Sequence, residues 1–575
     1  LKAYPTGMTT GITSVLQTSR EPYAWDHAGF SAPAPEDLVI YELLLRDFLE
    51  AHDWKTLTDT LNYFSALGIN AIELMPVNEF EGNESWGYNP SFYFAPDKYY
   101  GPSDDLKVFI DSCHGRGIAV IIDMVLNHSY GESPMVQLYF DESSGKVAAD
   151  NPWYNVDSPN PVFSWGYDFD HQSEATQRFV DSVNHFWLSE YQVDGFRFDF
   201  TKGFTNTAGD GSGYDQSRID ILKRMAEGIW QIKADAYVIL VHFAANAEEF
   251  ELSEEGMMLW GNLNYAYNQA TMGYDDGWDF SQISYKERFW NQALLVGYME
   301  SHDEERLMYK NLSFGNSSGS YNIQDLHTAL AREELAGVFF FPVPGPKMIW
   351  QFGELGYDYS IDYDCRVCNK PIRWDYYKTG LRRRVYQVWS ALIQLKISEA
   401  AFHSDDFNLD LSGAAKRIEI NHADMDVRII GNFGVEALAV NPSFSETGTW
   451  YSFFDGDSIQ VTDTQDPISL EPGAYLLYTS KRLTKPEITA RIGSFTIPGK
   501  SLRVFPNPVI DMLHVEPLPE PSLLFILNSK GQVIMSQVLE AYQDQVDLSS
   551  LTPGLFVISR QSGTERPQRA KIIVE

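Results

Sequence analysis

Eight short apolar segments recur between residues 38 and 351, and segments with helical spacing separate them. Each has the apolar, β-prone character of a strand, and strands that alternate with helices are typical of βαβ units with a parallel sheet. Eight such units predict a (β/α)8 barrel, the TIM-barrel fold of the α/β class, with insertions. The predicted strands are Leu38–Tyr41, Ala71–Leu74, Ala119–Met124, Gly195–Asp199, Tyr237–Val241, Leu259–Asn264, Leu295–Glu300 and Lys347–Gln351.

The intervals between these strands carry helical patterns and one long insertion. Leu57–Leu67 has the spacing of an amphipathic helix that ends at Gly68, and Ser217–Ile232 has the same character. The longest interval, residues 127–172, follows the third strand and is rich in Pro, Asn, Asp and Gly. We expect it to form an inserted subdomain that covers the site.

The barrel is expected to occupy residues 35–400, with other modules on either side. Residues 401–482 change to short strands with turn signals, which predicts an all-β C-terminal domain. Residues 483–500 are expected to be a linker that leads to a β-sandwich at 501–575. Residues 1–34 are polar and rich in Pro and Ala, which indicates a linker or the remnant of an upstream module.

The composition limits the partners of the chain. The formal net charge is −36 over 575 residues, which repels nucleic acid and anionic membranes and suits a secreted protein that acts on a neutral substrate. No apolar run is long enough to predict a membrane-spanning helix. The first five residues do not resemble a signal peptide and indicate the interior of a longer precursor. Nothing in the sequence indicates an oligomeric state.

Two of the three cysteines, Cys365 and Cys368, have the spacing of a redox motif. They follow a loop rich in Asp and Tyr, whereas a redox motif lies where a strand enters a helix. A loop disulfide and two unrelated thiols are the alternatives that remain. Two cysteines are too few for a zinc site.

The fourth predicted strand ends in the charged sequence Gly195-Phe196-Arg197-Phe198-Asp199-Phe200-Thr201-Lys202. Alternation along a strand sends Arg197 and Asp199 to the same face. The guanidinium favours the ionised form of the neighbouring carboxyl group, so we expect Asp199 to be a charged nucleophile at neutral pH. The seventh strand also ends in acidic residues, and strand ends that are distant in sequence converge at one face of a barrel.

Five motifs at or near these strand ends resemble those of glycoside hydrolase family 13, the α-amylase family, over residues 37–480. The resemblance implies a retaining hydrolase of α-1,4-glucans such as starch, glycogen and maltooligosaccharides. Retention needs a nucleophile on one face of the sugar and a proton donor on the other. The motifs are Trp86–Tyr88, Asp123–His128, Gly166–His171, Gly195–Lys202 and Glu300–Asp303.

The resemblance also implies a role for each matching residue. Asp199 is expected to be the nucleophile, and Asp303 is expected to stabilise the transition state. The remaining matches are expected to contact the substrate or to support the residues that do. They are Tyr88, Asp123, His128, Arg197, Lys202, His242 and His302.

The expected proton donor is absent. In the family a glutamic acid ends the fifth barrel strand, and the matching residue here is Val241. Valine donates no proton, and a general acid typically contributes about 10²–10⁴-fold to the rate, so we expect this copy to be impaired. One interpretation is a single altered or engineered codon, which the other retained site residues favour. The other is a natural glucan-binding descendant.

Asn127 and Asp168 match positions that hold calcium in the family, and both carry the hard oxygen donors that calcium prefers. Two solvated loop residues are the alternative interpretation. No organic cofactor is expected.

The C-terminal segment resembles a second family. Its Pro506-Asn507-Pro508 opening and its basic, apolar ending at Lys571–Glu575 resemble the sorting domain of proteins exported by the bacterial type IX secretion system. The resemblance implies recognition by that machinery and a location at the cell surface or outside the cell. A generic accessory β-sandwich is the alternative.

Two other functions compete with hydrolysis. The sequence Glu300–Glu304 is also compatible with a branching or other transglycosylating enzyme of the same family. A non-catalytic starch-binding protein is the alternative from another class. New α-1,6 branches in the products of amylose would distinguish transfer from hydrolysis.

Overall fold

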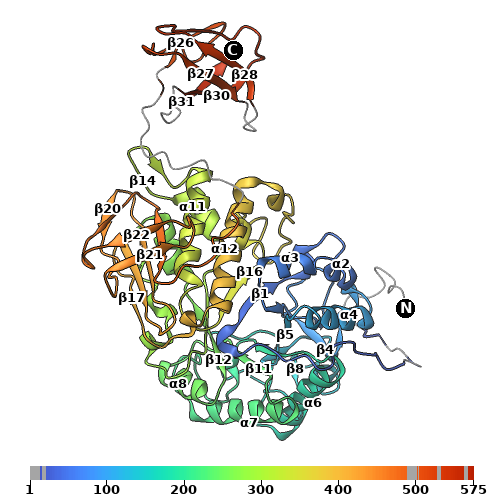
Figure 1. The fold of residues 1–575 in the computed structure, drawn as a ribbon. Coiled ribbons are helices and arrows are strands. Elements are labelled where there is room, and N and C mark those ends of the chain that lie inside the picture. Colours follow the sequence, from blue (N-terminus) through green and yellow to red (C-terminus); the bar gives the residue numbers. More distant parts are fainter. Residues whose placement is uncertain are drawn as a thin grey trace. The chain divides into compact units, whose positions relative to one another are not determined.

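Eight parallel strands close into one barrel (Figure 1). Around the barrel, the strands follow the order β1, β16, β13, β12, β11, β10, β5, β2. All-β sheets follow the barrel in the chain, so the predicted fold class is confirmed. The barrel strands are β1 (Val39–Leu43), β2 (Ala71–Leu74), β5 (Ala119–Met124), β10 (Gly195–Phe198), β11 (Tyr237–Leu240), β12 (Met258–Asn262), β13 (Leu295–Tyr298) and β16 (Lys347–Trp350).

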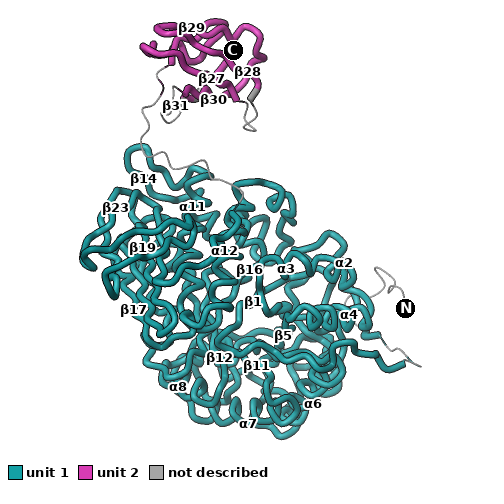
Figure 2. Tube along the Cα trace, viewed as in Figure 1, with its two compact units in different colours: residues 1–491 teal, residues 492–575 magenta. Residues whose placement is uncertain are grey.

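The chain divides into two compact units, Leu1–Arg491 and Ile492–Glu575 (Figure 2). The computed structural model describes residues 13–15, 18, 21–488, 502, 504–527, 533–561 and 568–574. Most of the predicted N-terminal segment before residue 21, and residues 489–500 of the predicted linker, lie outside these described residues. Within them, no helix combines the length and the apolar character needed to cross a membrane.

Apolar side chains fill the inside of the barrel. One buried cluster, which includes Val241, Trp260 and Tyr298, draws members from every barrel strand except β10. Members that come from seven strands of a closed barrel meet at its axis, as in other barrels of this kind. On β10 the corresponding inward positions are Gly195 and Arg197. The interior is therefore apolar apart from charged groups near the carboxyl ends of the strands.

Helices surround the barrel and cover the outward faces of its strands (Figure 1). The helix predicted at Ser217–Ile232 is present as α7. The larger helices of this layer are α4 (Ser103–His114), α6 (Glu174–Glu190), α7 (Gln216–Ile232), α8 (Asn246–Glu254), α9 (Asn264–Met272), α10 (Leu307–Phe314), α11 (Leu326–Phe340) and α12 (Gly380–Ser398).

The prediction of one helix over Leu57–Leu67 is wrong. The structure has two helices there, α2 (Trp54–Asp59) and α3 (Leu61–Leu67), with Thr60 between them. The Thr60 hydroxyl donates a hydrogen bond to the Leu57 carbonyl at 2.7 Å, and such bonds from Thr compete with helical hydrogen bonding. The predicted end is correct, since Gly68 adopts the left-handed conformation at φ +95° that closes many helices.

The interval after β5 forms small antiparallel pairs, among them β6 (His128–Ser129) with β9 (Tyr167–Asp168). This pairing holds the inserted segment against the end of β5. It contains, in addition, α5 (Pro134–Gln137), β7 (Phe140–Asp141) and β8 (Lys146–Val147).

The all-β region after the barrel consists of a six-stranded sheet and a two-stranded sheet. Its strands are β17 (Phe407–Asp410), β18 (Ala415–Ile420), β19 (Val427–Asn432), β20 (Leu438–Val440), β21 (Gly448–Ser452), β22 (Ser458–Val461), β23 (Ile468–Leu470) and β24 (Tyr475–Thr479). The second unit has its own buried cluster, including Leu513, Leu524 and Ile558. Its strands are β25 (Val504–Phe505), β26 (Met512–Val515), β27 (Ser522–Leu527), β28 (Val533–Leu539), β29 (Gln545–Asp547), β30 (Gly554–Gln561) and β31 (Gln568–Val574).

Candidate active site

Arg197 joins two carboxylates at the barrel mouth. It projects inward from β10, and its Nη1 donates to Asp123 Oδ1 at 2.8 Å and to Asp199 Oδ1 at 3.0 Å. The predicted common face of Arg197 and Asp199 is therefore present. Because the Arg197 guanidinium is buried, this charge-assisted pairing holds Asp199 in one position.

Asp123, at the end of β5, has a second partner. The Tyr88 hydroxyl donates to Asp123 Oδ2 at 2.6 Å. Burial raises the pKa of Asp123 to about 6, although Arg197 acts in the opposite direction. Above the guanidinium lies the Trp260 ring, whose centroid is 4.2 Å from Arg197 Cζ. Asp123 and Arg197 thus form a supporting layer beneath the groups that face the cleft.

Asp199 is the more accessible carboxylate, with 18% of its side chain exposed. The residue after it, Phe200, adopts left-handed backbone angles of φ 46° and ψ 49°. Phe243, after β11, has a φ of 49°. Left-handed conformations of non-glycine residues are strained, and such strain concentrates at functional sites. Two neighbouring strand ends share this feature.

His302 lies between two carboxylates. Its Nδ1 is 2.5 Å from Glu42 Oε1 on β1, and its Nε2 is 3.3 Å from Asp303 Oδ2. Burial alone would lower the pKa of His302, but Asp303 and Glu42 raise the pKa well above its usual value. In turn, His302 and Arg197 outweigh burial and hold the pKa of Asp303 well below its usual range. Asp303 is therefore an ionised carboxylate whose side chain is 49% exposed.

Tyr88 and His128 form the adjacent wall. The Tyr88 ring stacks on His302, with ring centroids 5.1 Å apart and planes at 25°. His128 Nε2 is 2.9 Å from the Tyr88 carbonyl oxygen. Burial lowers the pKa of His128, which favours the neutral ring. These side chains are brought together from three separate parts of the chain, as the motifs predict.

Lys202 lies beside aromatic rings of the inserted segment. Its Nζ is 4.6 Å from the Phe163 ring centroid and 5.4 Å from that of Phe200. Trp165 packs edge-on against Phe200 at 5.1 Å and lies 6.2 Å from His128. The inserted segment therefore places two partly or largely exposed aromatic rings, Phe163 and Trp165, beside Lys202 and His128.

Val241 stands at the site but carries no polar atom in its side chain. Phe198 pairs with Leu240 on the neighbouring strand, so Val241 continues that register level with Asp199. The side chain is 9% exposed and belongs to the apolar barrel interior.

His242 does not reach the cleft, which corrects the prediction that it contacts the substrate. It is fully buried, its Nε2 is 2.9 Å from Glu248 Oε1, and its Nδ1 is 3.0 Å from the Thr201 hydroxyl. Arg218 pairs with the same Glu248 carboxylate at 2.7 Å. Val241 faces the barrel interior, and the next residue along an extended chain faces the opposite side. His242 therefore points outward, away from the barrel interior, into this ion-pair network.

The two residues matched to calcium ligands, Asn127 and Asp168, have different surroundings in the structure. Asp168 accepts hydrogen bonds from Asn155 Nδ2 at 2.8 Å and from the Ser158 hydroxyl at 3.2 Å, so both of its oxygens are engaged. Asn127 Oδ1 is buried without a partner. The described residues contain no cluster of three acidic, His or Cys side chains around a common point.

Sequence reasoning missed two contributors to the site. Glu42 orients His302, and its signal is an acidic residue inside an apolar strand that we expected to end at Tyr41. Arg366 lies 3.5 Å from Asp303 Oδ1. It is carried by the loop that the Cys365–Cys368 disulfide closes, which settles the alternatives for these cysteines.

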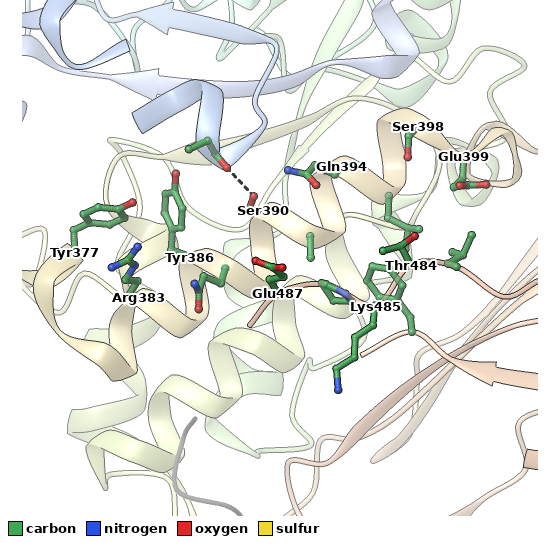
Figure 3. Close-up of a pocket in the computed structure, with 17 residues that line it drawn as sticks. Tyr377, Arg383, Tyr386, Ser390, Gln394, Ser398, Glu399, Thr484, Lys485 and Glu487 are labelled. Atoms are coloured by element: carbon green, nitrogen blue, oxygen red, sulfur yellow. Dashed lines mark hydrogen bonds between the residues drawn. The ribbon is translucent and has the colours of Figure 1, made fainter. Parts of the chain in front are cut away.

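A cavity of about 600 Å³ lies away from this site, along α12 (Figure 3). Its lining includes Arg383, Gln394 and Glu399 from α12 and the following turn, and Lys485 and Glu487 from the segment after β24. None of the lining residues comes from the barrel mouth. We therefore assign it no part in the chemistry.

Two family models match parts of this chain. The model of the alpha amylase catalytic domain matches residues 46–165, and the model of the secretion system C-terminal sorting domain matches residues 503–575. The first match confirms the resemblance to the α-amylase family. The sorting-domain match likewise confirms the expected export to the cell surface or the exterior.

Individual relatives in the α-amylase family match different lengths of the chain. A malto-oligosyltrehalose trehalohydrolase of Saccharolobus solfataricus is 32% identical over 193 residues, which are 33% of this chain and 32% of the relative. The chain thus spans about a third of that protein. A 1,4-alpha-glucan branching enzyme of Oceanobacillus iheyensis is 25% identical over 74% of this chain and 70% of its own length.

Solved structures share the fold. An α-amylase from Geobacillus thermoleovorans in complex with acarbose matches with a TM-score of 0.62 and 16% identity, over 79% of this chain and all of that one. A type I pullulanase of Bacillus subtilis in complex with maltose matches with a TM-score of 0.61 and 20% identity, over 81% of this chain and 72% of that one.

Proposed function

We propose that this chain is an exported α-amylase-type retaining glycoside hydrolase that acts on α-1,4-glucans. The observation that carries the proposal is the Arg197 side chain, which holds Asp123 and Asp199 beside the His302–Asp303 pair at one end of the barrel. Starch, glycogen and maltooligosaccharides are neutral, in keeping with the net charge of −36.

In this proposal Asp199 attacks the anomeric carbon of the sugar. Arg197 orients the carboxylate, and the ionised Asp303 stabilises the positive charge that develops on the sugar. Tyr88, His128 and His302 position the reacting sugar, and Lys202 with its aromatic neighbours contacts the sugars on the leaving side. Water then releases the glycosyl group from Asp199.

Val241 makes the first step slow on natural substrates. The departing glycosidic oxygen needs a proton, and the side chain at the expected acid position has none to give. A glycosyl fluoride avoids this requirement, because fluoride leaves without protonation. We expect measurable release of fluoride from α-glucosyl fluoride and very slow release of reducing ends from starch.

The test compares the unaltered chain with Asp199→Asn. The unaltered chain should release fluoride and the variant should not, since its amide is a poor nucleophile. Thermal unfolding of both proteins checks that the variant is folded. Equal release by the two proteins would refute the role of Asp199. Binding of maltoheptaose without any fluoride release would instead indicate a glucan-binding protein.

A branching or other transglycosylating activity is the second candidate. The observation in its favour is the similarity to a 1,4-alpha-glucan branching enzyme over 74% of this chain. Incubation with amylose distinguishes the two activities, since transfer produces new α-1,6 linkages and hydrolysis produces reducing ends.

A further inference from the structure

Glu304 is a carboxyl group at the barrel mouth that the proposed mechanism does not use. Its Oε1 accepts a hydrogen bond from Asn262 Nδ2 at 2.6 Å, and its Oε2 accepts one from the Ser301 hydroxyl. The Tyr298 hydroxyl lies 3.5 Å from Oε1. Three polar groups from the ends of β12 and β13 thus fix the position of this carboxyl group.

Glu304 and the empty acid position lie at the same end of the barrel, with one strand, β12, between their strands. Leu240 pairs with Leu259, so Val241 continues that register level with Trp260, and both side chains lie in the barrel interior. Asn262 is two residues beyond Trp260 on β12, hence on the same face and one layer nearer the mouth. β12 lies between β11 and β13. Through its hydrogen bond with Asn262, Glu304 reaches from the segment after β13 to the end of β12, the strand beside β11, after which Val241 follows.

The surroundings of Glu304 favour a carboxyl group that keeps its proton. Burial raises the pKa of Glu304 to about 7, and the negative charges of Asp303 and Glu42 act in the same direction. The Ser301 hydrogen bond and the His302 charge oppose them. Adjacent Asp303 has its pKa held well below the usual range. Neighbouring carboxyl groups whose pKa values are driven apart are typical of an acid and its ionised partner.

We propose that Glu304 donates the proton to the departing glycosidic oxygen in this chain, in place of the acid absent at Val241. The inference rests on the proposed function. As Asp199 forms its bond to the anomeric carbon, the bond to the glycosidic oxygen breaks, and that oxygen takes the electron pair and the Glu304 proton. Water then attacks the same carbon and gives a proton back to the Glu304 carboxylate, and Asp199 leaves.

The test compares Glu304→Gln with Glu300→Gln on two substrates. The amide of the Glu304→Gln variant can still accept from Asn262 but cannot donate an acidic proton. We expect this variant to lower starch hydrolysis by about 10²-fold, the lower end for a positioned acid. The rate of fluoride release in the first turnover of α-glucosyl fluoride, before water attacks the glycosylated Asp199, should be unchanged. Glu300 is the matched control: burial also raises its pKa to about 7, but its Oε1 accepts from the Leu307 backbone N–H at 2.5 Å, behind the site.

The pH profile and a second variant separate proton donation from a structural role. Starch hydrolysis by the unaltered chain should fall as the pH rises through about 7, and Glu304→Gln should remove this limb. With Val241→Glu present as well, the Glu304→Gln change should lose most of its effect.

Three results would overturn the inference. One is an unchanged rate on starch in Glu304→Gln. Another is an equal loss on starch and in the first turnover of α-glucosyl fluoride, which indicates that Glu304 only positions Asp303. The third is the absence of turnover of either substrate by the unaltered chain, which overturns the proposed function too. One combination overturns only the role of Glu304. In it, fluoride release depends on Asp199, and Glu304→Gln changes neither fluoride release nor starch hydrolysis.

Discussion

Val241 lies where a carboxyl group would be both buried and next to another carboxylate. It packs with Trp260 and Tyr298 and stands level with Asp199 on the neighbouring strand. Burial and a nearby negative charge each raise the pKa of a carboxyl group. A glutamic acid at this position would therefore stay protonated, as a proton donor must.

With Glu304→Gln as the background, we expect Val241→Glu to raise starch hydrolysis by about 10²–10⁴-fold, the usual contribution of a positioned acid. Only the protonated form donates, so the gain should disappear as the pH rises through the raised pKa of the new side chain. Reducing ends released from soluble starch across the pH range measure both effects. Val241→Gln is the control, because it has the same size without an acidic proton. An equal gain in both variants would contradict the explanation.

At the residue scale, alternation along a strand was sufficient to pair Arg197 with Asp199, because neighbours two apart in a strand share a face. The same rule, applied one residue further along β11, puts His242 on the opposite face from Val241. What the sequence did not reveal was its partner: Glu248 lies on the next helix, and only the folded chain brings it to the ring. Glu42 was missed for a related reason, since its partner His302 is distant in sequence.

At the element scale, the inserted segment between β5 and β10 carries Trp165, one of the aromatic residues expected to contact the sugars on the leaving side. Trp165 is 44% exposed and packs its edge on Phe200 beside His128. We expect Trp165→Ala to raise the KM for maltoheptaose roughly fivefold, which corresponds to about 1 kcal/mol for one lost stacking contact. The small α-glucosyl fluoride should be unaffected, because it does not extend to the leaving side.

Phe94→Ala is the matched control for Trp165→Ala, because it also removes a half-exposed aromatic ring. Phe94 on β4 (Pro90–Pro96) is 43% exposed, close to the exposure of Trp165, and packs against Phe179 and Phe186 of α6. Initial rates at several maltoheptaose concentrations measure the two variants side by side. A rise in KM for Phe94→Ala as large as that for Trp165→Ala would show that the effect is not specific to the cleft.

The barrel strands were predictable because buried parallel strands are apolar segments bounded by turns. β2 and β5 have the predicted bounds, and the other six differ by one or two residues at one or both ends. Helix continuity was harder to foresee. The apolar spacing runs without a break through Leu57–Leu67, and the interruption at Thr60 depends on one hydroxyl bonded to a carbonyl. Periodicity does not record that local competition.

At the scale of the whole molecule, the second unit has what it needs to fold by itself. Its buried cluster includes Leu513, Leu524 and Ile558, and within the described residues its strands pair only with one another. The sorting-domain match covers 503–575, within the unit Ile492–Glu575. None of the candidate site residues belongs to it. The sorting-domain match and the candidate active site thus lie in separate parts of the chain.

Removal of residues 495–575 should therefore abolish export and leave the barrel intact. In a bacterium with a type IX secretion system, we expect the truncated chain to remain inside the cell. Its unfolding temperature and its fluoride release should equal those of the barrel in the full chain, because no strand pairing of the barrel is lost. The reciprocal control fuses residues 495–575 to an unrelated reporter, which should then be exported. Appearance of the truncated chain outside the cell at the normal level would refute the sorting role, and loss of fluoride release would refute the separation of the two functions.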